Sequence, residues 1–190
     1  MARTPSTMMP LGTPMPHFTL EDTHGNDVSN ENSTTEGTLV IFLSNHCPFV
    51  IHLKPELSAM TQKYSDRLNI FGIMSNDTEA YPADAPKKMH EDANAYQYCF
   101  PYLFDPSQSV AKAFQAACTP DFFLFDAQGA LFYRGQFDAS RPGNHVPVTG
   151  DDLLAAIEAL LNGLAAPAVQ QPSLGCNIKW KPGNAPDYFG

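Results

Sequence analysis

A cysteine at the start of a predicted helix is the first candidate for chemistry in this sequence. Cys47 follows the apolar run Thr38–Ser44 and precedes Pro48, a residue that suits the first turn of a helix. The positive end of a helix dipole and the free N–H groups of the first turn favour a thiolate and lower the pKa of a thiol. A buried, inert cysteine is the alternative, because free cysteine also packs well in a core.

Three further cysteines, Cys99, Cys118 and Cys176, are widely spaced along the 190 residues. In a reducing compartment such a set is expected to be free thiols, and without a Cys-x-x-Cys pair a structural zinc site has no support. Cys118 lies two residues before Pro120 and is a candidate second thiol, with burial at a strand entry as the alternative. Cys176 lies in an irregular tail, either as a mobile second thiol or packed beside Trp180.

Two apolar runs predict the strands that position Cys47. Residues 38–44 and 68–75 are rich in β-branched and aromatic side chains, which is typical of strands buried on both faces of a parallel sheet. Between them, apolar side chains recur at spacings of three and four over residues 47–67, which predicts a helix. Because Pro55 removes a helical hydrogen bond, we expect a short segment, a kink and a longer segment.

The second half of the chain predicts further α and β elements. Residues 107–116 form a predicted helix with Ser107 at its N-cap. Residues 121–126 and 130–135 predict a β-hairpin, and residues 151–164 an amphipathic helix. A βαβ unit followed by a hairpin and a helix indicates an α/β fold with a mixed sheet.

Four motifs occur in order along the chain, and together they carry a resemblance. They are Leu11–Leu20, Ser44–Val50, Cys118–Asp126 and Leu174–Lys181. The set resembles a thioredoxin-like, peroxiredoxin-like family of AhpC/TSA-related proteins, whose active-site turn usually reads Cys-Asn-His-Cys-Pro. The resemblance covers residues 11–185. It implies a thioredoxin-like fold, with a mixed central β-sheet flanked by helices and an irregular C-terminal tail.

The resemblance also implies which residues form the site. Cys47 is the implied reactive cysteine, and Pro120 is implied to follow a cis peptide bond that presents the Thr119 backbone to whatever approaches Cys47. Cys118, two residues before Pro120, is then the internal candidate for a resolving thiol. His46, directly before Cys47, is a further candidate to stabilise a thiolate.

Ser44 is where this sequence departs from the family. It replaces the first cysteine of the usual pair, so a disulfide between positions 44 and 47 is not available. In peroxiredoxins a hydroxyl at this spacing hydrogen-bonds the reactive thiolate, and we expect Ser44 to do so. Two other peroxiredoxin residues are missing: Val40 replaces a proline, and residues 117–120 contain no arginine.

Composition limits the partners and the location. The net charge of −9 disfavours nucleic acid and anionic membrane surfaces as partners. No apolar run suggests a signal peptide or a membrane span, so a cytoplasmic location is the default expectation. No cofactor or metal is expected, and the sequence does not determine the oligomeric state. The expected organisation is an irregular arm over residues 1–10, a thioredoxin-like domain over 11–164 and a tail over 165–190 packed on the domain.

Three functions follow from these observations. The first is a thiol-based redox enzyme, either a thiol-disulfide oxidoreductase or a peroxiredoxin-like peroxidase, with Cys47 as its single nucleophile. Its partners would be protein or small-molecule thiols and disulfides, or peroxides. The second is a redox-inactive thioredoxin-fold module that binds an extended peptide beside Pro120. The third, a metallochaperone, is disfavoured because the turn contains one cysteine.

Overall fold

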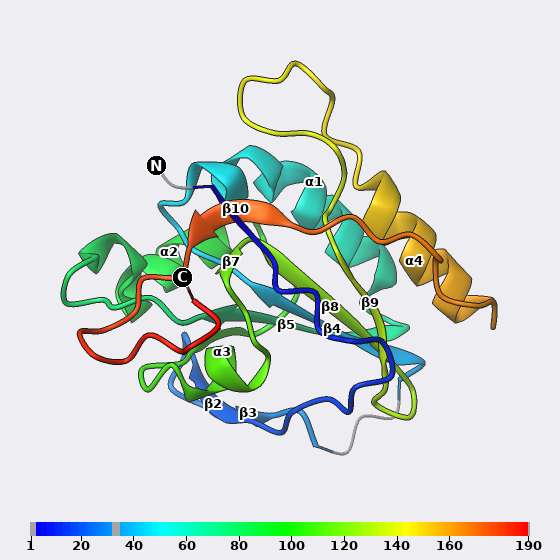
Figure 1. Cartoon of the computed structure of the whole chain (residues 1–190). Coiled ribbons are helices and arrows are strands. Elements are labelled where there is room, and N and C mark those ends of the chain that lie inside the picture. Colours follow the sequence, from blue (N-terminus) through cyan, green and yellow to red (C-terminus); the bar gives the residue numbers. More distant parts are fainter. Residues whose placement is uncertain (1–2, 32–34, 190) are drawn as a thin grey trace.

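The computed structural model describes residues 3–31 and 35–189 (Figure 1). Its strands are β1 (Arg3–Pro5), β2 (Thr19–Asp22), β3 (Asp27–Ser29), β4 (Gly37–Phe42), β5 (Leu68–Met74), β6 (Tyr102–Phe104), β7 (Cys118–Thr119), β8 (Asp121–Asp126), β9 (Leu131–Gly135) and β10 (Leu174–Asn177). Its helices are α1 (Pro48–Tyr64), α2 (Pro86–Ala95), α3 (Ser109–Ala113) and α4 (Asp151–Leu161), with a 3₁₀ helix η1 (Pro82–Asp84).

The central sheet is mixed, as predicted. Across the described residues it has seven strands in the order β3-β2-β6-β5-β4-β8-β9. β4 pairs in parallel with β5 and antiparallel with β8, and α1 forms the crossover from β4 to β5. The predicted α/β class with a mixed central sheet flanked by helices is therefore confirmed.

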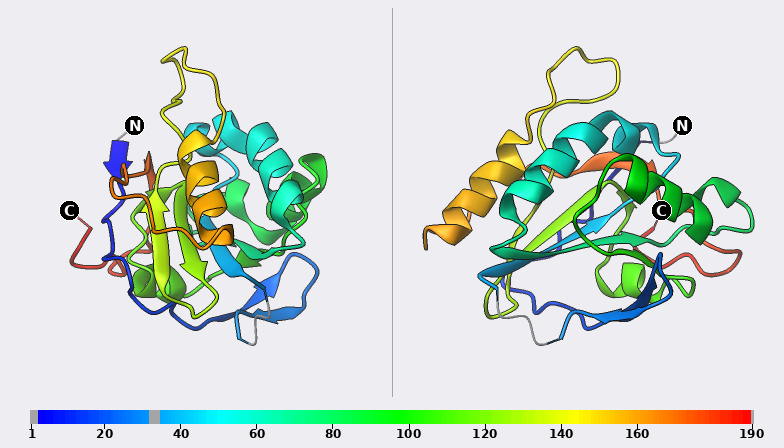
Figure 2. Two further views of the ribbon diagram at one scale, coloured as in Figure 1. Left: turned by 90° about the vertical axis from the view of Figure 1, so that its right-hand side faces the viewer. Right: turned by 180° about the vertical axis from the view of Figure 1, so that it is seen from behind.

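Two apolar layers cover the two faces of this sheet. Along β4 the side chains alternate: Leu39 and Ile41 pack in the layer that contains α1 and α4, while Val40 and Phe42 pack in the layer that contains α3. α1 and α4 lie side by side over one face (Figure 2). Every residue of β4 is buried, as expected for a strand inside a two-faced core.

A smaller sheet joins both ends of the chain to the centre. In the described part of the chain its order is β1-β10-β7, with both pairs antiparallel (Figure 1). The irregular arm predicted over residues 1–10 is therefore wrong at Arg3–Pro5, while residues 1–2 of that arm lie outside the described residues. A strand of three residues shows too little alternation to be recognised, and β1 forms because β10 offers it a pairing edge.

α1 also differs from the prediction. It is a single helix with Pro55 inside, where two segments were expected. Proline removes the hydrogen bond to the carbonyl four residues earlier, here that of Ile51. Ile51 and Pro55 are both exposed, so water can bond the freed carbonyl and the helix continues.

α3 begins later than predicted, because its N-cap is Gln108 and not Ser107. The carboxylate of Asp105 accepts hydrogen bonds from the Ser107 hydroxyl at 3.1 Å and from the Ala111 N–H at 3.0 Å. The Ser107 hydroxyl is thus already engaged in the turn that precedes the helix.

Candidate active site

Cys47 lies between the end of β4 and the first turn of α1. It is the N-cap residue of α1, and Pro48 is the first helical residue, which confirms the predicted position at a helix start. The side chain is fully buried, with 0% exposure. Its thiol donates a hydrogen bond to the carbonyl oxygen of Thr119 at 3.1 Å.

Thr119 and Pro120 face Cys47 from the other side of the site. The Thr119–Pro120 peptide bond is cis, as the resemblance implied. Thr119 also pairs with Cys176 in the register between β7 and β10. The two strands approach closely at Gly175, where a Cβ atom would lie 2.0 Å from the Thr119 carbonyl oxygen. Only glycine allows this approach, and it brings Cys176 to Cys47.

The surroundings of Cys47 favour its thiolate. The neighbouring thiol of Cys176, which stabilises negative charge on the Cys47 sulfur, is the largest cause that lowers the pKa of Cys47. Burial opposes this effect, while the Thr119 hydroxyl and the N–H groups of Val50 and Cys176 add to it. Together these effects lower the pKa of Cys47 from its ordinary value of 9.0 to about 6. The thiol is therefore activated at neutral pH.

The other cysteines have different environments. The contact with Cys47, followed by burial, raises the pKa of Cys176. Burial, followed by the charge of Asp121, raises the pKa of Cys118 well above its ordinary value. Cys118 is buried and its sulfur lies 3.6 Å from the Pro120 carbonyl oxygen. Cys99, which was not singled out as a site residue, is exposed.

Ser44 does not have the contact that was predicted for it. Its hydroxyl donates to the carboxylate of Asp84, at 3.2 Å from Oδ1 and 3.1 Å from Oδ2. Among the hydrogen bonds of the described residues, none joins Ser44 to Cys47, so this prediction is corrected. The reason is that a fully buried carboxylate needs hydrogen-bond donors, and Asp84 lies within reach of Ser44.

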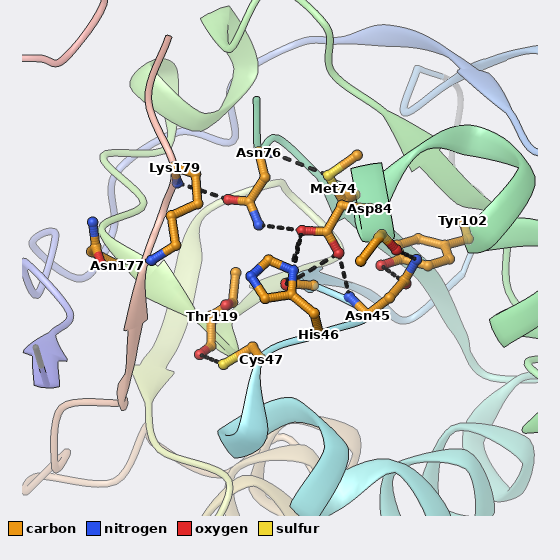
Figure 3. A network of polar contacts seen from close by, with 12 residues as sticks. Asn45, His46, Cys47, Met74, Asn76, Asp84, Tyr102, Thr119, Asn177 and Lys179 are labelled. Carbon is orange, nitrogen blue, oxygen red and sulfur yellow. Dashed lines mark hydrogen bonds and ion pairs between the residues drawn. The ribbon is translucent and has the colours of Figure 1, made fainter. Parts of the chain in front are cut away.

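Asp84 is the centre of a network that holds the turn before Cys47 (Figure 3). Its carboxylate accepts hydrogen bonds from the Asn45 N–H at 2.7 Å and the Asn76 side-chain amide at 2.6 Å. The Nδ1 atom of His46 lies 2.9 Å from Asp84 Oδ2, and the His46 ring stacks on Tyr81. Three consecutive residues, 44–46, are thereby fixed to one buried carboxylate.

The charges of Asp84 and His46 support each other. Burial raises the pKa of Asp84, but the hydrogen bonds from His46 and Asn76 outweigh it and leave that pKa lowered. The hydrogen bond to Asp84 in turn raises the pKa of His46. Sequence reasoning missed Asp84 altogether, because its spacing from Cys47 forms no motif.

The C-terminal segment is joined to the same network. The N–H of Lys179 donates to Asn76 Oδ1 at 2.8 Å, and the Lys179 carbonyl accepts from the Asp77 N–H at 2.8 Å (Figure 3). Ile178, next in the chain, is 1% exposed. The segment that contains Cys176 is thus anchored to the same network as the turn before Cys47.

A hollow on the surface adjoins the site. Phe49, Leu53, Pro120, Phe122, Phe137 and Leu174 supply its apolar lining. Within residues 3–31 and 35–189, no group of three or more His, Cys, Asp or Glu side chains is arranged to hold a metal ion. In the same described residues, no helix combines the length and the apolar character needed to cross a membrane.

Two sequence comparisons place this site among known proteins. The model of the AhpC/TSA family matches residues 11–134, a range that includes both Cys47 and Thr119-Pro120. The thiol-disulfide oxidoreductase YkuV of Bacillus subtilis is 30% identical over 125 residues, which are 65% of this chain and 83% of that protein.

Two solved structures extend the comparison. An uncharacterised conserved protein from Geobacillus kaustophilus is 46% identical, with a TM-score of 0.93 over 96% of this chain and 98% of that chain. The thioredoxin domain of a thiol-disulfide oxidoreductase from Bacteroides vulgatus is 20% identical, with a TM-score of 0.62 over 81% of this chain and 99% of that chain. The fold is therefore thioredoxin-like, and the first match also includes most of the chain after residue 134.

Proposed function

The chain belongs to the AhpC/TSA family, and we propose that it is a thiol-disulfide oxidoreductase in which Cys47 is the nucleophile. The observation that carries the proposal is the position of Cys47 at the N-terminus of α1, in contact with Thr119 and Cys176. The B. subtilis relative YkuV, which is named a thiol-disulfide oxidoreductase, supports the same thiol redox role.

The proposed reaction begins with the Cys47 thiolate. It attacks one sulfur of a substrate disulfide, forming a mixed disulfide and releasing the other sulfur as a thiolate that takes up a proton. A second thiol then attacks the Cys47 sulfur, releases the remaining half of the substrate as a thiol and leaves an oxidised disulfide product. The Cys176 thiol, followed by the Thr119 hydroxyl, stabilises the attacking thiolate.

Access to Cys47 requires a local opening, because its side chain is fully buried. The hollow lined by Phe49, Pro120 and Leu174 lies next to the residues that cover the thiol. We place the substrate over this hollow once the opening has widened it, with the substrate sulfur directed at Cys47, because its volume of about 10 Å³ in the closed structure admits no more than a water molecule. A hydroperoxide is the second candidate substrate, since a small oxidant needs less opening than a protein disulfide; it would convert the Cys47 thiolate to a sulfenic acid and be reduced to an alcohol.

The test is the pH dependence of alkylation by iodoacetamide, followed for each cysteine by mass spectrometry. Because Cys47 is buried and Cys99 exposed, the informative quantity is the pH midpoint and not the absolute rate. We expect a Cys47 midpoint of about 6 in the folded chain. The same cysteine in the urea-unfolded chain is the matched reference and should titrate near ~8.5.

Turnover completes the test. Reduction of hydroxyethyl disulfide or of tert-butyl hydroperoxide, with an external thiol as the reductant, assigns the substrate class. Cys47→Ser should abolish both, while Cys99→Ser, at an exposed cysteine, should change neither. A folded-state midpoint equal to the unfolded one, with no turnover of either substrate, would favour the peptide-binding module instead.

A further inference from the structure

We infer that Cys176 is the second thiol of this site and that it forms an intramolecular disulfide with Cys47 in each reaction cycle. The inference rests on the proposed function, because it requires Cys47 to react first. It goes further by giving a catalytic role to the C-terminal segment, which lies beyond the part of the chain that the AhpC/TSA model matches.

The pairing of β10 with β7 provides the geometry. Cys176 lies directly opposite Thr119, whose carbonyl oxygen accepts the hydrogen bond from Cys47. Cys47 and Cys176 also belong to the same buried cluster, and the Cys176 thiol is the largest cause that lowers the pKa of Cys47. A disulfide brings two sulfur atoms to ~2 Å, so two thiols that neighbour each other within one cluster need only a local approach.

Both sulfur atoms also lie near the first turn of α1. The N–H of Val50, which donates to the Cys47 carbonyl oxygen at 3.0 Å, lowers the pKa of Cys47, and the N–H of Phe49 lowers the pKa of Cys176. N–H groups in the first turn of a helix stabilise negative charge on a nearby sulfur. The start of α1 therefore favours negative charge on either sulfur.

The charges give the order of the two steps. Cys176 keeps its proton at first, because the neighbouring Cys47 thiolate is the largest cause that raises the Cys176 pKa. Once Cys47 is part of a mixed disulfide, its charge is gone and that cause disappears. The Phe49 N–H and the Lys179 ammonium then lower the pKa of Cys176 against the remaining effect of burial. Cys47 thus attacks first and Cys176 second.

The second step forms the disulfide between Cys47 and Cys176. The Cys176 thiol loses its proton, and the thiolate attacks the Cys47 sulfur of the mixed disulfide. The new bond joins the sulfurs of Cys47 and Cys176, and the bond from Cys47 to the substrate breaks. The substrate half leaves as a thiolate and takes up the proton. Overall, two thiols of the protein are oxidised to one disulfide, and the substrate disulfide is reduced to two thiols.

Cys118 is less well placed for this role. It pairs with Asn177, one position along the register from the pair of Thr119 and Cys176. Successive side chains on a strand point to opposite faces, so Cys118 faces away from the side on which Cys176 meets Cys47. Its raised pKa, which results mainly from burial, also keeps it protonated.

Disulfide mapping of the full chain tests the inference. The reduced protein is treated with hydroxyethyl disulfide, quenched with acid, alkylated and digested, and linked peptides are identified by mass spectrometry. We expect one intramolecular link, between Cys47 and Cys176. In Cys176→Ser, Cys47 should instead accumulate in a mixed disulfide with the hydroxyethyl group, while Cys118→Ala and Cys99→Ser should still form the Cys47–Cys176 link.

The possible results are distinct. A link between Cys47 and Cys118, or a stable mixed disulfide on Cys47 in the unsubstituted protein, would overturn the role of Cys176 and leave the nucleophile proposal intact. No modification of Cys47 under any condition would overturn both. The unsubstituted protein alone decides between these outcomes, so the test does not depend on the folding of a variant.

Discussion

The Sγ atom of Cys47 lies 3.1 Å from the carbonyl oxygen of Thr119, a residue 72 positions later in the chain. A carbonyl can accept a hydrogen bond from a thiol, but it has no proton to donate to a thiolate. The hydroxyl of Thr119 is buried and has no hydrogen-bond partner among the described residues of the protonated site. After the Cys176 thiol, this hydroxyl is the next cause that lowers the pKa of Cys47, so it is a second donor for the sulfur once the thiol loses its proton.

Thr119→Val should therefore weaken the thiolate. The substitution keeps the branched shape and removes only the hydroxyl. A hydrogen bond to a charged group contributes ~1.5–3 kcal/mol, so the alkylation midpoint of Cys47 should rise by about one pH unit or more. Thr61→Val is the matched control, since Thr61 is equally buried in α1 and its hydroxyl donates to the Ser58 carbonyl. Equal midpoints in the two variants would contradict this role for Thr119.

Asp84→Asn should destabilise the fold. It leaves the donors of Ser44, Asn45, His46 and Asn76 around a neutral amide with a single acceptor oxygen. Removing one partner of a buried charged network costs about 3 kcal/mol, measured as a lower urea midpoint with an unchanged m-value. Glu91→Gln, which breaks an exposed pair with Lys88, should cost less than ~1 kcal/mol. A cost for Asp84→Asn no larger than that of this control would rule out a structural role for the network.

The central strands could be predicted because their signal is local. Asp121–Asp126 has the same bounds in the sequence prediction and in the structure. A short apolar run between a proline and a turn is itself the evidence for a buried strand. The cis bond before Pro120 was likewise implied by a continuous motif, Cys118–Asp126, that needs no knowledge of the rest of the fold.

Contacts between distant segments could not be predicted in this way. The position of Asp84 beside Ser44 depends on how the loop after β5 returns to the end of β4. The meeting of Cys176 with Cys47 depends on the register of β10, a strand of four residues with no alternating pattern. The predicted bond from Ser44 to the thiolate was wrong for the same reason, since no local pattern indicated the buried carboxylate that accepts the Ser44 hydroxyl.

His46→Gln should have a cost that depends on pH. The pKa of His46 is raised above 6.5 in the folded chain, so its contribution is fully present below pH 6.5 and is lost as the pH rises through the folded value. The pKa of Asp84 is lowered below 3.8, so its contribution is present above pH 3.8 and is lost as the pH falls through the folded value. The difference in unfolding free energy should be largest between these limits and should shrink at alkaline pH.

Urea unfolding at several pH values measures this difference, with His17→Gln, at a side chain 76% exposed, as the control. A cost that is the same between these limits and at alkaline pH would contradict the ion pair.

Gly175→Ala should separate β10 from the site. An added Cβ would lie 2.0 Å from the Thr119 carbonyl oxygen and 3.2 Å from the Pro120 nitrogen, and both are backbone atoms. Since backbone cannot yield locally, the strand must shift, at a cost of ~1–3 kcal/mol in unfolding free energy. The shift moves Cys176, the largest cause that lowers the Cys47 pKa, away from Cys47, so the alkylation midpoint of Cys47 should rise while amide exchange in Leu174–Asn177 becomes faster. Gly183→Ala lies in the same C-terminal segment, and its added Cβ has no atom within 4 Å, although the φ of +73° strains the local turn; it should leave the Cys47 midpoint unchanged. If Gly175→Ala altered neither the midpoint nor the exchange, the close approach of β10 to Thr119 would not be what sets the reactivity of Cys47.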